Sequence, residues 1–189
     1  MPGKRARDVL TGGTKDVNPQ YIRLQSAQSG ADTFTSEGFP LPQNRFQEQE
    51  GRVVVLEFLR VTYQLATLPL IAAVGETIDS ISASISTGSI ASAPTIATTG
   101  LIGPLAFKQR VGAFTAGGTY AYIEPIIYDF DLTDAAGHGI LVATDNIFVN
   151  SASVTTGNTN TTRVLIEYRF KKVSLAEYVG IVQAQSVLT

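Results

Sequence analysis

The sequence predicts an all-β fold, namely an antiparallel β-sandwich of about eight strands in one domain. Three observations favour this class. Only 16% of the 189 residues are charged, against about 25% in an average soluble domain, and the abundant Ser and Thr residues suit strands and turns better than helix interiors. Several segments alternate between apolar and polar residues, which is the period of a strand with one buried face. Turn residues such as Gly, Pro, Asn and Asp separate these segments.

The first half of the domain contains four expected strands. One starts at Tyr21, and a short one over 34–41 is ended by prolines, which suits a sheet edge. Segment 52–65 is rich in β-branched and aromatic residues and almost continuously apolar, which predicts a central strand covered on both sides. In 80–86, Ile and Ala alternate with Ser. This pattern predicts a strand with one wet, uncharged face that could accept a neighbour.

The second half adds a long loop, further strands and a short helix. Residues 87–104 are mostly Gly, Ser, Thr, Ala and Pro, which predicts a long functional surface loop. Gly137 and Gly139 are expected to take positive φ in a turn, and Ser174 with Glu177 matches a capping box, which predicts a short helix or turn over 175–183. Strands are expected at 107–114, 120–130, 140–149 and 163–171, with turns at 131–139 and 151–160. This count of strands is typical of a jelly roll.

Composition restricts the class of protein. Cys and Trp are absent, which excludes a disulfide framework and a thiolate metal site. No stretch approaches the 18 or so apolar residues of a membrane span, and the first residues lack the apolar core of a signal peptide. We therefore expect a protein that is kept in a reducing cytosolic or nuclear compartment, without membrane insertion, cofactor or bound metal.

Few residues are suited to catalysis. His138 is the single histidine, and its setting, Ala-Ala-Gly-His-Gly, favours a polar turn residue over a member of a catalytic triad. The aspartates of the same region lack the spacing of a calcium loop, which favours solvated turn carboxylates; they are Asp129, Asp131, Asp134 and Asp145. Gly12–Lys15 lacks the spacing of a phosphate loop. We therefore expect that the chain is not an enzyme.

Residues 1–16 predict a short, basic and mobile N-terminal arm, and 17–189 the single folded domain. The net charge of the chain is −2, yet basic residues gather in the arm. Clustered cations on such an arm neutralise phosphates without fixed geometry, and a solubilising tail or a nuclear-import signal is the alternative. One copy would bind nucleic acid weakly, whereas many copies around one cavity would bind through multivalency. The cations are Lys4, Arg5, Arg7 and Lys15.

Three segments carry a resemblance to a known family. They are 4–19 (KRARDVLTGGTKDVNP), 132–146 (LTDAAGHGILVATDN) and 168–183 (YRFKKVSLAEYVGIVQ). Together they resemble, from end to end, the capsid proteins of small circular, Rep-encoding single-stranded DNA (CRESS DNA) viruses. The resemblance implies a single jelly roll and a self-assembled icosahedral shell of about 60 identical subunits (T=1). It also implies a circular single-stranded DNA genome inside the shell and a place in the virion, with assembly in the host nucleus or cytoplasm; the host receptor is left open.

The arm holds fewer basic residues than the Arg-rich arms of many related capsids. The hypothesis is therefore that divalent ions, polyamines or other inward-facing cations, such as Arg23, help to neutralise the genome. The candidate nucleic-acid-binding residues are Lys4, Arg5, Arg7, Lys15 and Arg23.

Two other classes of protein share the predicted architecture. An oligomeric jelly-roll binding module, lectin-like or an appendage domain, would have the same composition but would form a small, soluble oligomer. A cupin-like enzyme would need clustered His ligands for its metal, and one histidine makes this class the weaker alternative.

Overall fold

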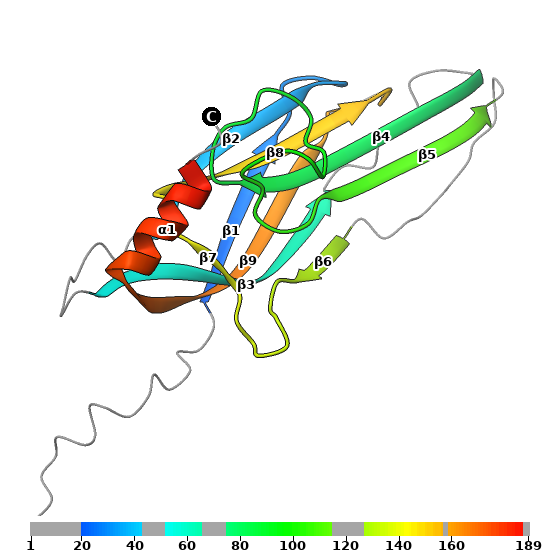
Figure 1. The fold of residues 1–189 in the computed structure, drawn as a ribbon. Helices are drawn as coiled ribbons and strands as arrows, with labels where there is room; N and C mark the ends of the chain where they lie inside the picture. Colours follow the sequence, from blue (N-terminus) through cyan, green and yellow to red (C-terminus); the bar gives the residue numbers. More distant parts are fainter. Residues whose placement is uncertain (1–19, 43–51, 66–74, 115–126, 157–158, 187–189) are drawn as a thin grey trace, which may run out of the picture.

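The computed structural model describes residues 20–42, 52–65, 75–114, 127–156 and 159–186. Within these ranges nine β-strands and one α-helix are present, and the strands form two antiparallel sheets (Figure 1). In chain order the elements are β1 (Gln20–Ala27), β2 (Phe34–Pro40), β3 (Arg52–Leu65), β4 (Gly75–Ser86), β5 (Ala106–Phe114), β6 (Ile127–Asp131), β7 (Ile140–Val142), β8 (Asn146–Val154), β9 (Thr161–Ser174) and α1 (Leu175–Ser186).

The order of the strands is that of a jelly roll. Sheet A has the order β1-β9-β3-β6, with the short β7 beside β3, and sheet B has the order β2-β8-β4-β5. Most connections cross from one sheet to the other, so strands that neighbour each other in space, such as β1 and β9, are far apart in the sequence. The predicted eight-stranded antiparallel sandwich is confirmed, and β7 is a ninth, short strand that the sequence pattern did not indicate.

The core lies between the two sheets and follows the predicted alternation. In β9, Val164 and Ile166 are buried while Arg163 is exposed. In β3, the ring of Tyr63 meets Phe130 of β6 edge to face, with ring centroids 6.1 Å apart. Each fully buried aliphatic side chain contributes roughly 1.5–3 kcal/mol. The core includes Leu56, Phe58, Val61, Tyr63, Ile81, Ala83, Ile85, Ile147, Val149, Val164, Ile166 and Tyr168.

A β-bulge divides β3 into two halves. The register with β9 shifts between Phe58 and Arg60, so Leu59 is an extra residue and the side chains before it change faces. Phe58 and Val61 can therefore both point into the core. The half of β3 after the bulge pairs with β6, and the half before it pairs with β7.

The expected single strand at 140–149 is wrong, because the chain changes sheets within it. Ile140–Val142 pairs with β3 in sheet A, whereas Asn146–Val154 pairs with β2 and β4 in sheet B. Helix α1 holds the crossing between them, since the Gln185 side chain donates to the carbonyl oxygen of Leu141 (2.7 Å) and accepts from the amide of Ala143 (3.0 Å). A continuous apolar pattern does not reveal such a crossing.

The two glycines of the 131–139 turn have different roles. Gly137 has a φ of 79°, as expected. Gly139 is not among the described residues with positive φ, so that part of the prediction is wrong. What requires glycine at 139 is space, because a Cβ atom there would lie 2.1 Å from the carbonyl oxygen of Phe58.

The serine face of β4 is buried, which contradicts the expected wet face. Ser84 and Ser86 both receive hydrogen bonds from the Asn150 amide, at 3.3 and 2.8 Å, and Ser86 donates to the carbonyl oxygen of Gly88. The neighbour that covers this face is the chain's own loop 87–104, drawn in green over β2 and β8 in Figure 1. The loop returns through Ile102, whose amide donates to the carbonyl oxygen of Ile85.

The turn expected at 151–160 is partly strand and partly buried. Ser151 and Ser153 belong to β8, and their hydroxyls lie in a hydrogen-bonded group that closes one end of the sandwich. Asn160 donates to the hydroxyl of Ser151 at 3.1 Å, and Ser153 donates to the side-chain oxygen of Gln28 at 3.0 Å. This end of the interior is therefore polar, and the apolar core begins beyond it.

Helix α1 covers a small apolar cluster on the outer face of sheet A. The helix begins as the capping box predicts, because the amide of Glu177 donates to the hydroxyl of Ser174 (3.2 Å), and it extends to 186. Tyr178 packs against Val53, Val55 and Val173. None of the helices in the described ranges is long and apolar enough to cross a membrane.

Two predictions fall on residues outside the described ranges. The basic arm 1–16, and with it the domain boundary at 17, stays a prediction. Of the strand expected at 120–130, only Ile127 onward is described, as β6.

Replacing Gly139 with Ala is expected to lower the free energy of unfolding by roughly 2–4 kcal/mol, because the new methyl group overlaps the β3 backbone. Urea denaturation followed by circular dichroism measures this. Gly88→Ala is the matched control, because a Cβ atom at Gly88 meets nothing within 4 Å. Equal stability of the two variants would contradict the packing role of Gly139.

Candidate functional site

The outer face of sheet A brings side chains of four strands into a regular array. Across the sheet, Arg23 of β1 is opposite Leu165 of β9, which in turn is opposite Thr62 of β3. The next row consists of Gln25, Arg163, Gln64 and Ile127. These residues share one face because side chains alternate along each strand.

A groove of about 380 Å³ lies in this array. Two guanidinium groups border it, those of Arg23 and Arg163, and both residues are exposed. Arg163 Nε donates to the side-chain oxygen of Gln25 at 3.0 Å, which fixes the direction of its guanidinium group. The lining residues are Arg23, Leu24, Gln25, Thr62, Gln64, Ile127, Arg163, Val164 and Leu165, and none of them is acidic.

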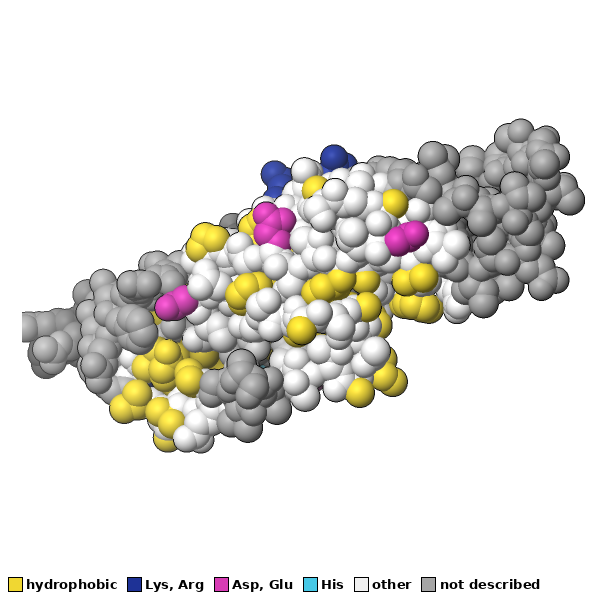
Figure 2. All heavy atoms as spheres, turned by 90° about the horizontal axis from the view of Figure 1, so that it is seen from above, with side chains coloured by type: hydrophobic (Ala, Val, Ile, Leu, Met, Phe, Trp, Pro, Cys, Tyr) yellow, Lys and Arg dark blue, Asp and Glu magenta, His cyan; other side chains and the backbone are white. Residues whose placement is uncertain are grey.

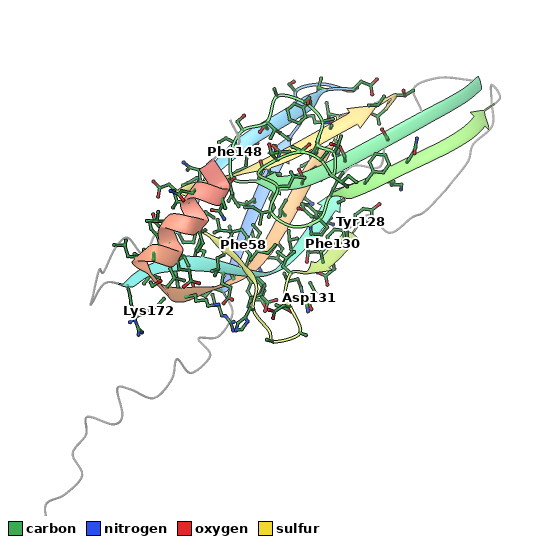
Figure 3. The ribbon with its side chains drawn as sticks, in the orientation of Figure 1. Phe58, Tyr128, Phe130, Asp131, Phe148 and Lys172 are labelled. Atoms are coloured by element: carbon green, nitrogen blue, oxygen red, sulfur yellow. The ribbon has the colours of Figure 1, made fainter. Side chains whose placement is uncertain are left out.

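Acidic residues lie beside the groove and have partners of their own. Asp129 accepts a hydrogen bond from Thr62 (2.8 Å) and lies 3.8 Å from Arg60. Asp131, at the end of β6 in Figure 3, accepts from both the amide and the hydroxyl of Thr133. These hydrogen bonds lower the pKa of Asp131 below its usual value. Both carboxylates are therefore held within the sheet edge and its loop by hydrogen bonds.

A buried carboxylate fixes the other half of the same face. The Glu57 side chain is fully buried and accepts hydrogen bonds from Arg169 Nε, Lys171 Nζ (3.1 Å) and the amide of Gly139 (3.0 Å). Arg169 also donates to the carbonyl oxygen of Gly137 at 3.0 Å. The cluster of Glu57, Arg169 and Lys171 thus ties the β6–β7 loop to strands β3 and β9.

Two opposing effects set the pKa of Glu57. Burial favours the neutral acid and would raise the pKa, but hydrogen bonds from Arg169, Lys171 and the Gly139 amide favour the carboxylate and hold the pKa below its usual value. Because the folded-state pKa is depressed, this ion cluster stabilises the fold above the unfolded-state pKa of about 4.3 and is lost as the pH falls through the folded value.

The turn that contains His138 is held by hydrogen bonds within itself. Asp134 accepts from the amides of Ala136 and His138, both at 2.9 Å, and these bonds, with His138 Nδ1 3.4 Å away, lower the pKa of Asp134. Both side chains are more than half exposed. In the described part of the chain no three His, Cys, Asp or Glu residues gather as a metal site would need.

The outer face of sheet B differs from that of sheet A in charge. The serine face of β4 is buried under loop 87–104. The outward side chains beside it that remain exposed carry no charge; they are those of Phe107, Gln109 and Val154. Phe107 and Val154 are about half exposed (52% and 53%). Figure 2 views the molecule from above the orientation of Figure 1, where β2, β8 and β4 lie uppermost, and few charged side chains appear on its described surface.

The structure describes one of the five candidate nucleic-acid-binding residues, and the role of all five stays a prediction. Arg23 lies on the outer face of β1, at the groove. Lys4, Arg5, Arg7 and Lys15 lie outside the described residues, so their role stays a prediction. Arg163 was missed as a groove residue, because only the pairing of β1 with β9 brings it beside Arg23.

Topology and surfaces together define a jelly-roll β-sandwich with one charged and one largely uncharged outer face. No protein-family model matches the sequence, and no curated protein matches it. Solved structures do share the fold, at very low sequence identity, and they are viral capsid proteins.

Two polyomavirus VP1 structures illustrate the similarity. VP1 of Trichodysplasia spinulosa-associated polyomavirus, in complex with 3′-sialyllactose, superposes with a TM-score of 0.55 and 8% identity, covering 84% of this chain and 97% of that one. The unassembled pentamer of Merkel cell polyomavirus VP1 gives a TM-score of 0.51 and 8% identity, covering 85% of this chain and 98% of that one. The chain therefore has the jelly-roll fold of these capsid proteins.

Replacing Glu57 with Gln is expected to lower the free energy of unfolding at pH 7 by about 1–3 kcal/mol, because Arg169 and Lys171 lose their buried partner. As the pH falls below the unfolded-state pKa of about 4.3 the difference should shrink, because the unfolded parent chain then binds a proton at Glu57 that the folded chain resists. Urea denaturation between pH 3 and pH 7 measures both effects. The control is Glu37→Gln, which removes the same charge from an exposed position. A difference between parent and Glu57→Gln that did not vary with pH would contradict the ion cluster.

Proposed function

We propose that this chain is a structural viral capsid protein that self-assembles into a closed shell. The observation that carries the proposal is the jelly-roll topology, which it shares with the VP1 capsid proteins over most of both chains. A fold alone hosts many functions, so the surfaces must agree with the proposal as well. They do so in two ways, through the uncharged face of sheet B and through the low overall charge of the chain.

Subunit contacts explain the uncharged face. Charged residues are depleted and aromatic residues enriched at the centres of protein interfaces, and the outer face of sheet B presents Phe107 and Val154 among uncharged neighbours. Only 16% of the residues are charged. Such a surface protects an isolated domain poorly from association, whereas in a shell much of it is covered.

The finer parts of the proposal come from the sequence resemblance to CRESS DNA virus capsids. They are a T=1 shell of about 60 copies, a circular single-stranded DNA genome inside it, and assembly in the host nucleus or cytoplasm to give the virion. In this arrangement the arm turns inward, and Lys4, Arg5, Arg7 and Lys15 of every copy face the genome. Repetition of a weakly basic arm around one cavity then supplies the affinity that one copy lacks.

The competing proposal is an oligomeric jelly-roll binding module that recognises a glycan. What favours it is that the Trichodysplasia spinulosa-associated polyomavirus VP1 structures contain 3′-sialyllactose or GM1 oligosaccharide. A binding module of this kind would remain a small oligomer. Particle size therefore separates the two proposals.

The purified chain is expected to form uniform closed particles. About 60 copies of the 20.1 kDa chain amount to roughly 1.2 MDa, and light scattering with negative-stain imaging measures this mass and shape. A stable monomer, trimer or pentamer across salt and pH conditions would contradict the shell and favour the binding module.

Replacing Phe107 with Asp is expected to raise the concentration needed for particle formation at least about tenfold, because a charge would be buried in the subunit contact. Phe107→Tyr is the matched control, because it keeps the aromatic ring, and it should assemble like the parent chain. Circular dichroism establishes that both variants fold. Normal assembly of Phe107→Asp would exclude this part of sheet B from the contacts.

A further inference from the structure

The outward face of β1 carries an unusual sequence of side chains for an edge strand. Tyr21, Arg23 and Gln25 lie two residues apart and therefore share this face. Tyr21 is 55% exposed and Arg23 is exposed as well. An exposed aromatic ring, a guanidinium group and an amide thus follow one another along the edge of sheet A.

Strand β9 adds a second cation to this edge. Leu165 is the cross-strand partner of Arg23, and Arg163, two residues away, is its diagonal neighbour. Diagonal neighbours in an antiparallel pair are about 7–8 Å apart, so the two guanidinium groups can contact successive groups of one extended ligand. Between and beside them, Leu165 and Ile127 supply apolar surface and Gln25 and Gln64 supply amides.

We propose that this groove binds single-stranded nucleic acid, with Arg23 and Arg163 on the phosphates and Tyr21 as a stacking surface for a base. Guanidinium groups pair well with phosphate oxygens, and base stacking on an exposed aromatic ring tolerates any sequence. The groove lining is positive and lacks acidic residues, which complements a phosphodiester backbone. The inference deepens the proposed function and rests on it for the identity of the cargo, because it gives the enclosed genome a binding site on the folded domain.

The geometry favours a single strand over a duplex. A face four strands wide is too broad to enter the major groove of a duplex, which admits an α-helix or a two-stranded ribbon. Unpaired bases, in contrast, can lie flat on Tyr21 and Ile127 and form hydrogen bonds with the amides of Gln25 and Gln64. Ile127 is 55% exposed and is therefore available for such contacts.

Neighbouring carboxylates lie at the margins of the site and are not among the residues that line the groove. Glu167 is the cross-strand partner of Tyr21 and bounds the positive stretch on one side. Asp129 is next to Thr62 and is paired with Arg60 at 3.8 Å. Asp129 ends the row that starts at Arg23, so the positive part of the face is restricted to the β1 and β9 side of the two rows that contain Arg23 and Arg163.

The position of β1 joins this groove to the basic arm. Lys15 precedes Tyr21 by six residues, a span of at most about 20 Å for an extended chain. Cations of the arm and of the groove can therefore contact the same strand of nucleic acid. When one chain supplies two weak binding elements, the binding of the first raises the effective concentration of the second, and the overall affinity increases.

The test is the affinity of the full chain, freed of nucleic acid at high salt, for a fluorescent oligo-dT of about 15 nucleotides, measured by anisotropy over a range of salt concentrations. The double variant Arg23→Ala/Arg163→Ala is expected to bind about tenfold more weakly at low salt. The slope of log K against log salt should also become shallower by about 1.4, because two phosphate contacts to a single strand are lost.

The matched control also removes two positive charges, at a different place on the same sheet. Arg52→Ala/Lys172→Ala acts at the far end of β3 and β9, where Figure 3 shows Lys172 well separated from Tyr128 and Phe130 of β6. At 0.1 M salt it should keep the affinity within about twofold, because the lost charges are then more than a Debye length of roughly 10 Å away. Tyr21→Ala should weaken binding about tenfold with an unchanged salt slope, while Tyr21→Phe keeps the ring and the affinity.

Different outcomes separate this site from the proposed function. Equal affinities of the groove double variant and its control would overturn the groove, and particles that still form and still contain DNA would leave the capsid role intact. Groove-dependent binding by a chain that never forms particles would keep the groove and reject the shell. Binding of 3′-sialyllactose that depends on Arg23 and Arg163, with unaltered oligo-dT binding, would overturn the proposal in favour of an acidic-glycan site.

Discussion

The β-bulge at Leu59 is the constraint on which the arrangement of sheet A depends. The extra residue lets Phe58 and Val61 both enter the core, and it divides β3 into one half that pairs with β6 and another that pairs with β7. At the division, the carbonyl oxygen of Leu59 accepts a hydrogen bond from the amide of Leu132, where the β6–β7 loop leaves the sheet. Without the bulge, period-2 alternation would turn Glu57 inward, toward an apolar interior. The groove and the buried ion cluster therefore lie on the same outer face of sheet A because of one inserted residue.

The two outer faces show how one sandwich can provide two kinds of surface. On sheet A, Arg169 and Lys171 form ion pairs with the buried Glu57. Arg23 and Arg163 lie at the other end of the same face and supply positive charge there. On sheet B, a hydrogen-bonded group of Ser84, Ser86 and Asn150 anchors loop 87–104 without any charge. Burying polar groups that bond to one another costs little, whereas burying unpaired charges costs a great deal. Sheet B is therefore uncharged beneath loop 87–104, and the exposed Phe107 and Val154 lie beside this buried group.

The sequence predicts well wherever neighbours along the chain decide the structure. The alternation in 163–171 and the capping box at Ser174 were both correct, because period and capping are local properties. Prediction failed where a segment distant in the sequence determines the local structure. The serines of β4 are buried by a loop that follows them, 140–149 divides because two sheets compete for it, and Gly139 is required by the backbone of Phe58. The groove belongs to this second group, since Arg23 and Arg163 are 140 positions apart in the chain and meet only through strand pairing.

The distribution of charge matters more for nucleic-acid binding than its total. A net charge of −2 would repel a polyanion if it were spread evenly, but screening confines each charge to about 10 Å at 0.1 M salt. Within that range the groove presents two guanidinium groups, and its acidic neighbour Asp129 is already paired with Arg60. Two contacts per chain are weak alone, yet a strand that crosses many identical grooves gains affinity with each one it reaches. In the proposed shell, a chain with few charges therefore assembles through an uncharged face and retains nucleic acid through a charged one.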